Sequence, residues 1–173
     1  TLQQSSAASD VYKRQEKILV DMLSGRDETV ATAESCTGGE IASSITNVSG
    51  SSRALLSGFV TYSNESKTAI LGVAPELIRK HGAVSSPVVE ELAEGCLRVS
   101  GADHAVAVSG IAGPDGGSEE KPVGTVYLGI ASRGGETFVK RCFSPSDRIS
   151  FKRRITRLAL DLLRRRLRGF PLN

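Results

Sequence analysis

The feature that most constrains the fold is a short apolar strand that leads directly into a turn rich in glycine and hydroxyl groups. Residues Thr29–Ala33 are small or β-branched, which is typical of a buried strand. The turn Ser35–Gly39 follows, and the apolar spacing after it predicts a helix over 38–47. A helix that opens in this way presents unpaired N–H groups and a partial positive charge. These suit a phosphate, a carboxylate or a developing oxyanion.

The same alternation of strand and helix continues along the chain. The spacing predicts helices near 16–24, 65–71, 75–80, 87–99 and 148–167, and strands near 55–62, 102–109, 124–132 and 136–143. Asn64 is expected to cap the helix over 65–71. Arg133–Gly135 is a hairpin signal between the last two strands. This order predicts an α/β fold: a three-layer α/β/α sandwich with a mixed sheet.

At 173 residues the chain is most simply one domain. Residues 1–14 lack an apolar period and an initiating methionine, and they resemble translated adapter sequence. We expect this tail to be non-native or disordered, and residues 15–173 to form the single domain.

Basic residues gather at the end of the chain. The formal net charge is only +3, yet residues 148–168 hold nine basic side chains against one acid, Asp161. Such a run is compatible with nucleic acid. Only Phe151 interleaves it as a stacking aromatic, so the sequence disfavours direct nucleic-acid recognition. A solvated helix face, with one or two arginines turned toward an anionic ligand, is the simpler interpretation.

Cysteine usage and hydropathy indicate the cellular compartment in which the chain is expected. Cys36, Cys96 and Cys142 are far apart and lack metal-ligand spacing, so a reducing, cytoplasmic location is expected. No apolar stretch is long enough to cross a membrane, and no secretory pattern is present. His81 and His104 have no metal-ligating company and are expected to be structural. We therefore predict neither a metal nor a cofactor.

Two glycine- and hydroxyl-rich turns, each at the end of an apolar strand, organise the functional hypothesis. Ligands of open α/β sheets bind beyond the carboxyl ends of strands, so Ser35–Gly39 and Ser109–Gly113 are expected to face one pocket. Tyr62 ends another strand, and Lys67 lies on the following helix. A buried lysine with a lowered pKa takes a proton from serine, so Ser35 and Lys67 form a candidate pair. Spacing alone leaves a solvated lysine and a packing tyrosine open.

Four segments of the chain closely resemble the CinA C-terminal domain family. They are Ala33–Gly39, Gly58–Lys67, His81–Ser85 and Ser109–Gly117, in order and at family-like spacing. The family includes stand-alone nicotinamide-nucleotide amidases. The resemblance implies a bacterial-type hydrolase of pyridine nucleotide salvage. It would convert nicotinamide mononucleotide to nicotinate mononucleotide and ammonia.

The resemblance also implies roles for single residues. Ser35 matches the family's catalytic serine, Tyr62 its tyrosine and Lys67 its lysine. We expect these to act as nucleophile, proton shuttle and base. Main-chain groups around the first turn are expected to bind the oxyanion or the phosphate, and both uses stay open. The other candidates for substrate contact lie in the two turns and at the start of the last helix: Cys36, Thr37, Gly38, Gly39, Ser109, Gly110, Gly113 and Arg148. Arg148 is expected to bind the phosphate, although Ser146 stands where the family usually has glycine.

Two other functions stay open at this stage. One is a nucleotide-binding or partner-binding module of the competence and damage-inducible family without turnover, and the other is an amidase of broader substrate range. Only a catalyst needs Ser35, Tyr62 and Lys67 together, which favours the amidase. The resemblance further implies a homo-oligomer, a dimer or larger, and no membrane partner.

Overall fold

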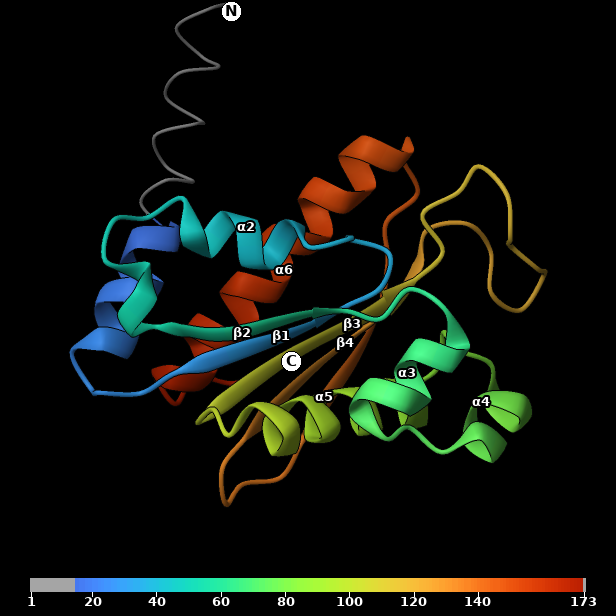
Figure 1. Cartoon of the computed structure of the whole chain (residues 1–173). Helices are drawn as coiled ribbons and strands as arrows, with labels where there is room; N and C mark the ends of the chain where they lie inside the picture. The colour runs from blue at the N-terminus through green and yellow to red at the C-terminus, as the bar shows by residue number, and fades with distance from the viewer. Residues whose placement is uncertain (1–14, 173) are drawn as a thin grey trace, which may run out of the picture.

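Five strands form one mixed sheet in the order β2–β1–β3–β4–β5 (Figure 1). The structure is a computed structural model and describes residues 15–172. The strands are β1 (Val30–Glu34), β2 (Leu55–Val60), β3 (His104–Gly110), β4 (Thr125–Ser132) and β5 (Phe138–Phe143). β1 runs parallel to β2 and β3, whereas β4 runs antiparallel to β3 and β5. The predicted mixed sheet is confirmed.

Helices cover both faces of this sheet. A first helix over 15–24, α2 (Glu40–Thr46) and α6 (Arg148–Leu167) lie on one face (Figure 1). The other face carries α3 (Asn64–Leu71), α4 (Pro75–His81) and α5 (Ser86–Ser100). A short 3₁₀ turn, η1, spans Ser51–Arg53. The three-layer α/β/α arrangement is therefore confirmed. Within residues 15–172, no helix combines the length and the apolar character that a bilayer span requires.

The central strand β1 is buried along its whole length because helices pack on both of its faces. Successive strand residues point to opposite faces. Val30 accordingly joins the core beneath α2 and α6, while Ala31 and Ala33 join the core beneath α5. The turn Ser35–Gly39 thus begins at the end of a strand that helices cover on both faces.

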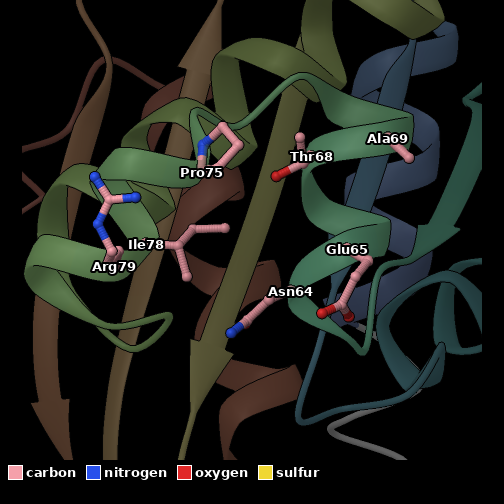
Figure 2. A pocket seen from close by; sticks show the side chains of 7 residues that line it. All are labelled: Asn64, Glu65, Thr68, Ala69, Pro75, Ile78 and Arg79. Atoms are coloured by element: carbon pink, nitrogen blue, oxygen red, sulfur yellow. The ribbon is translucent and has the colours of Figure 1, made fainter.

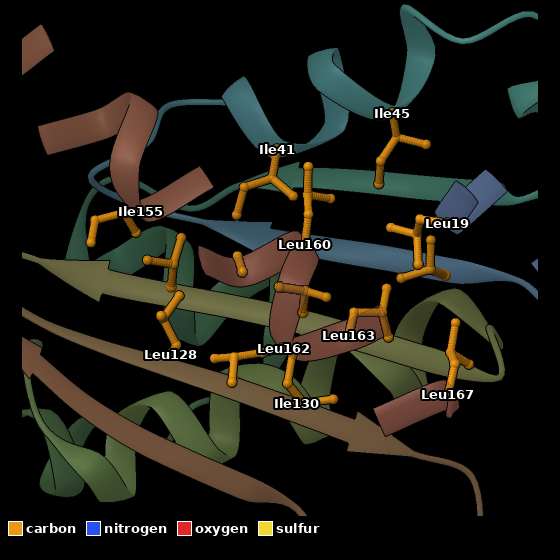
Figure 3. Packing of buried hydrophobic residues seen from close by; sticks show 14 of the residues in the cluster. Leu19, Ile41, Ile45, Leu128, Ile130, Ile155, Leu160, Leu162, Leu163 and Leu167 are labelled. Carbon is orange, nitrogen blue, oxygen red and sulfur yellow. The ribbon is translucent and has the colours of Figure 1, made fainter. Parts of the chain in front are cut away.

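The larger core lies between the sheet and the α2–α6 layer (Figure 3). The side chains of Ile155, Leu162 and Leu163 on α6 are at most 1% exposed, as are Ile41 and Ile45 on α2. Burial of each such aliphatic side chain stabilises the fold by about 1.5–3 kcal/mol. This packing fixes α6, and with it Arg148, relative to the first turn.

Helix boundaries differ from the sequence prediction in two places near the first turn. Ser63, not Asn64, caps α3, because Ser63 keeps the extended backbone that a cap needs and its hydroxyl accepts the Ser66 N–H at 3.1 Å. Likewise α2 begins at Glu40 rather than at residue 38, because Gly38 (φ 63°) and Gly39 (φ 94°) are left-handed. The predicted final helix, residues 148–167, is confirmed. The prediction for residues 1–14 lies outside the described residues.

Candidate active site

Three parallel strands end at the same edge of the sheet, and the predicted site residues follow them. Glu34, the last residue of β1, is level with Val60 of β2 and Val108 of β3. The Ser35 N–H continues this pairing by donating to the Val108 carbonyl at 3.1 Å. Ser35, Tyr62 and Ser109 therefore all lie at the carboxyl edge of the sheet, where α/β proteins bind ligands.

The structure brings Lys67 and Ser35 together at this edge. Lys67 Nζ lies 3.4 Å from Ser35 Oγ. Nζ also lies within hydrogen-bond distance of the carbonyl oxygens of Thr61 (2.9 Å), Tyr62 (3.2 Å) and Ser63 (3.4 Å), which can accept the N–H groups of the amine, and the side chain is almost fully buried. Burial lowers the pKa of Lys67 because it disfavours the charged ammonium, against the opposing influence of Cys36 and Glu65. A buried amine beside a hydroxyl is the arrangement that a serine nucleophile needs.

Tyr62 reaches the site from the end of β2 in two ways. Its backbone carbonyl accepts from Lys67, and its hydroxyl accepts from Arg148 Nη2 at 2.8 Å. Arg148 also donates from Nη1 to the Gly113 carbonyl at 2.9 Å. The guanidinium at the start of α6 thus joins Tyr62 to the second glycine-rich turn.

The buried carboxylate of Glu34 occupies the start of α2. It accepts N–H bonds from Gly39 (3.0 Å), Ile41 (3.0 Å) and Ala42 (2.9 Å) and the hydroxyl of Thr37 (2.6 Å). The sequence prediction of unpaired N–H groups at this helix start is therefore wrong, because the chain supplies its own anion. Among the amides of residues 35–42, only those of Cys36 and Thr37 donate to no oxygen of the described residues.

Cys36 is a packed side chain rather than a second nucleophile. Burial raises the pKa of its thiol to about 12, and the negative charge of Glu34 acts in the same direction. The backbone N–H of Cys36 itself lowers the pKa of the thiol, and Arg148 and Lys67 lower it by smaller amounts. The turn at Cys36 therefore lies within the electrostatic reach of Glu34, Arg148 and Lys67 at once.

The second glycine-rich turn is closely packed. Ser109 is buried within β3 opposite Tyr127, and Gly110 lies opposite Val126. A side chain at Gly113, whose φ is +74°, would come within 2.4 Å of Val123. The Gly113 carbonyl accepts from Arg148, and this arginine joins the second turn to Tyr62.

Lys152 is a neighbour of the first turn that the predicted site set did not include. Its Nζ lies 3.8 Å from Glu40 Oε2 and 3.7 Å from the position that a Cβ on Gly38 would take. Lys152 stands four residues after Arg148, and this spacing places both cations on one face of α6. That spacing is the sequence signal that identifies Lys152.

Much of the basic run on α6 has a structural explanation. Arg164 pairs with Asp161 at 2.6 Å, and Arg166 donates to the Glu136 carbonyl. Three arginines also lie in the last turn of α6, where their positive charge interacts favourably with the negative end of the helix dipole.

A cavity of about 480 Å³ lies between α3 and α4 (Figure 2). Its lining residues are Asn64, Glu65, Thr68, Ala69, Pro75, Ile78 and Arg79. Neither Ser35 nor Lys67 is among them. The cavity therefore belongs to the opposite flank of α3 from the serine–lysine pair.

A hydroxyl–imidazole–carboxylate array lies at the other end of the sheet, away from the serine–lysine pair. His104 Nδ1 is 2.9 Å from Ser132 Oγ, and Nε2 is 3.2 Å from Glu28 Oε2. Ser132 also borders a cavity of about 390 Å³, whose other walls include α5 residues. Strand alternation turns the Ser132 and His104 side chains toward the α6 face, away from α5. The array ties the ends of β1, β3 and β4 together, which agrees with the structural role expected for His104.

Among residues 15–172, no group of three or more histidine, cysteine or acidic residues is arranged to hold a metal ion.

Comparison with known proteins identifies the family. The sequence model described as "CinA C-terminal domain" matches residues 12–167. The chain belongs to the CinA C-terminal domain family. Within that family it is 55% identical over 142 residues to the Escherichia coli K12 "Nicotinamide-nucleotide amidohydrolase PncC", covering 82% of this chain and 86% of that protein. It is 54% identical over 145 residues to an Akkermansia muciniphila "CinA-like protein", covering 84% of this chain but 35% of that longer protein.

Solved structures of the family share the fold. The competence/damage inducible protein CihA from Agrobacterium tumefaciens superposes with a TM-score of 0.87 at 39% identity, covering 91% of this chain and 95% of the other. The competence damage-inducible protein A from Klebsiella pneumoniae gives a TM-score of 0.88 at 35% identity, covering 92% and 99%.

Proposed function

We propose that this chain is a nicotinamide-nucleotide amidohydrolase, which converts nicotinamide mononucleotide and water to nicotinate mononucleotide and ammonia. Its similarity to the Escherichia coli amidohydrolase supports the substrate. The approach of Lys67 Nζ to within 3.4 Å of Ser35 Oγ is the observation that carries the mechanism. A module that only bound nucleotide has no need of a buried amine beside a serine hydroxyl.

The reaction begins with the neutral amine of Lys67. It accepts the proton of the Ser35 hydroxyl as Oγ attacks the carboxamide carbon, giving a tetrahedral oxyanion. The proton held by Lys67 then passes through the Tyr62 hydroxyl to the carboxamide nitrogen, which leaves as ammonia, so that an acyl-serine ester forms and the amine of Lys67 is neutral again. Water, deprotonated by Lys67 in turn, attacks this ester and releases the carboxylate. Both half-reactions use the same base.

The amides of Cys36 and Thr37 supply the oxyanion site in this mechanism. They directly follow the nucleophile and have no other oxygen acceptor within residues 15–172. Donors fixed before the reaction stabilise the oxyanion without reorganisation, and loss of one such donor typically costs about 10²–10³ in kcat. In this mechanism the first turn therefore binds the oxyanion, and other groups bind the substrate phosphate.

Arg148 and Tyr62 serve the remaining parts of the substrate. The Tyr62 hydroxyl accepts from Arg148, so its own proton is free to pass to the departing nitrogen. Arg148 uses two of its donors on Tyr62 and Gly113, and its guanidinium carries five. The others suit the substrate phosphate. Main-chain groups of Ser109, Gly110 and Gly113 are the remaining candidates for contact with the ribose and the phosphate.

Ammonia release from nicotinamide mononucleotide tests this function. The wild type is expected to release ammonia and form nicotinate mononucleotide in equal amounts, while Ser35→Ala loses at least about 10³-fold in rate. Ser43→Ala, an exposed serine on α2, is the matched control and should keep wild-type turnover. Equal, slow release by wild type and Ser35→Ala would favour a binding module. Turnover of nicotinamide or nicotinamide riboside at a similar rate would favour a broader amidase.

A further inference from the structure

Glu34 is a fully buried acid that the mechanism above does not use. It immediately precedes the nucleophile, and both of its oxygens point into the start of α2. Three backbone N–H groups converge on it, and these can only donate. Its oxygens therefore act as acceptors, as those of a carboxylate do.

The carboxylate also completes the hydrogen bonding of the turn. The neighbouring amides that do not reach Glu34 donate to backbone carbonyls, namely Gly38 to Ser35, Glu40 to Thr37 and Ser43 to Gly39. An incoming anion would find no free backbone N–H group from residue 38 to residue 43. It would also meet a negative charge where a helix start normally attracts one.

The reaction at Ser35 changes the charge of the bound molecule beside this turn. The carboxamide of the substrate is neutral, whereas the product carries a carboxylate at that carbon. The field of Glu34 reaches the turn, since it adds to burial in raising the pKa of the adjacent Cys36 thiol. Lys67 offers the product little compensation when its amine is neutral, the form that its burial favours.

From this geometry we propose that Glu34 is a specificity residue: its buried charge closes the start of α2, residues 38–43, to anions and disfavours the product carboxylate beside Ser35, while the free amides of Cys36 and Thr37 hold the transient oxyanion. The proposal rests on the amidohydrolase function. Two unit charges within about 8 Å of each other, at the effective dielectric of a protein site, change a binding constant by about tenfold or more. Discrimination between amide and acid is expected on that scale.

Equilibrium binding to the Ser35→Ala protein at pH 8 measures the discrimination without turnover. Calorimetry should show nicotinate mononucleotide binding at least about tenfold more weakly than nicotinamide mononucleotide. Adding Glu34→Gln, which keeps the shape but removes the charge, should reduce this ratio by about tenfold. Adding Glu40→Gln, which removes a carboxylate from the same turn, should leave the ratio unchanged.

Several results would overturn the proposal. One is that nicotinate mononucleotide binds as tightly as nicotinamide mononucleotide or more tightly. Another is that Glu34→Gln leaves the ratio of the two affinities unchanged. A third is that Glu40→Gln changes this ratio as much as Glu34→Gln does. Because a ratio cancels a general loss of affinity, damage to the fold alone does not imitate the expected result. Should Glu34→Gln not fold, the ratio in the Ser35→Ala protein decides by itself.

Inorganic phosphate gives a test that does not depend on turnover of the nucleotide. Titration of the ¹⁵N-labelled wild type should leave the amide resonances of Gly39, Ile41 and Ala42 in place, and Glu34→Gln should let phosphate shift them. Phosphate that shifts these amides in the wild type would overturn the exclusion even if the chain releases ammonia. If the chain releases no ammonia but phosphate behaves as expected, the proposed function fails while the closure of the turn to anions stands.

Discussion

Lys67 Nζ lies 3.4 Å from Ser35 Oγ, although 32 residues separate them along the chain. Two short connections produce this contact: β1 ends at Glu34, immediately before Ser35, and its parallel neighbour β2 leads through the Ser63 cap into α3. Three backbone carbonyls, those of Thr61, Tyr62 and Ser63, also lie within 3.4 Å of the amine. Its position is therefore set by the chain rather than by the substrate.

The first prediction is that Lys67→Arg abolishes turnover. Arginine keeps the positive charge and the donors but does not deprotonate in proteins, so it cannot serve as base. We expect kcat for ammonia release to fall by about 10²–10⁴, the usual contribution of a general base, with Lys67→Met equally impaired. An arginine variant within tenfold of the wild type would show that Lys67 acts only as a fixed charge.

The second prediction concerns the pH dependence of the wild type. Burial lowers the pKa of Lys67 below its ordinary value of 10.5, and the base must be neutral to act. The value of kcat/KM should therefore rise with pH and level off, with the midpoint of this limb below 10.5. The assay is chromatographic measurement of nicotinate mononucleotide between pH 5 and 10. A rate that falls with pH over this range would exclude a neutral amine as the base.

The third prediction separates the two possible roles of Arg148. Charge-assisted hydrogen bonds contribute about 1.5–3 kcal/mol, so Arg148→Met should raise KM for nicotinamide mononucleotide by about 10–100-fold. Any weak turnover of nicotinamide riboside, which lacks the phosphate, should change far less. Arg153→Met, an exposed arginine on the same helix, is the control. An equal loss with both substrates would instead mean that Arg148 acts through Tyr62.

The sequence predicted the layers and the strand edge because both depend on regular patterns, whereas spacing offered Ser35 and Lys67 only as a candidate pair, which the family resemblance then favoured. Apolar periodicity defines the helices and strands, and parallel neighbouring strands necessarily end at one edge. The roles that the family resemblance gives to Ser35, Tyr62 and Lys67 stay predictions until the variants are assayed.

Other features depend on where single side chains turn, and local pattern does not determine that. The Glu34 carboxylate bonds to amides up to eight residues ahead, which requires the left-handed backbone at Gly38 and Gly39. Ser63 and Asn64 are both good caps, and only the path out of β2 decides between them. The Tyr62 hydroxyl meets Arg148 from 86 residues away, through the packing of α6.

The last prediction concerns the contact that seats α3, the helix that carries Lys67. Gly95 of α5 lies so close to the end of α3 that a Cβ there would be 2.1 Å from the Leu71 carbonyl oxygen. Backbone cannot give way as a flexible side chain does, so Gly95→Ala must push α3 off α5. Overpacking of this kind costs about 1–3 kcal/mol or more, and the better helix propensity of alanine returns only about 1 kcal/mol.

We expect the melting temperature of Gly95→Ala to fall by about 4–8 °C, on the scale of 2–4 °C per kcal/mol for a chain of this size. Ammonia release by the folded protein should fall as well, since Leu71 lies four residues after Lys67 on α3. Gly135→Ala is the matched control, because the nearest atom to its added Cβ would be 3.7 Å away and its φ is not left-handed. Thermal melting by circular dichroism compares the two variants. A Gly95→Ala protein as stable and active as Gly135→Ala would show that α3 is free to shift without disturbing the serine–lysine pair.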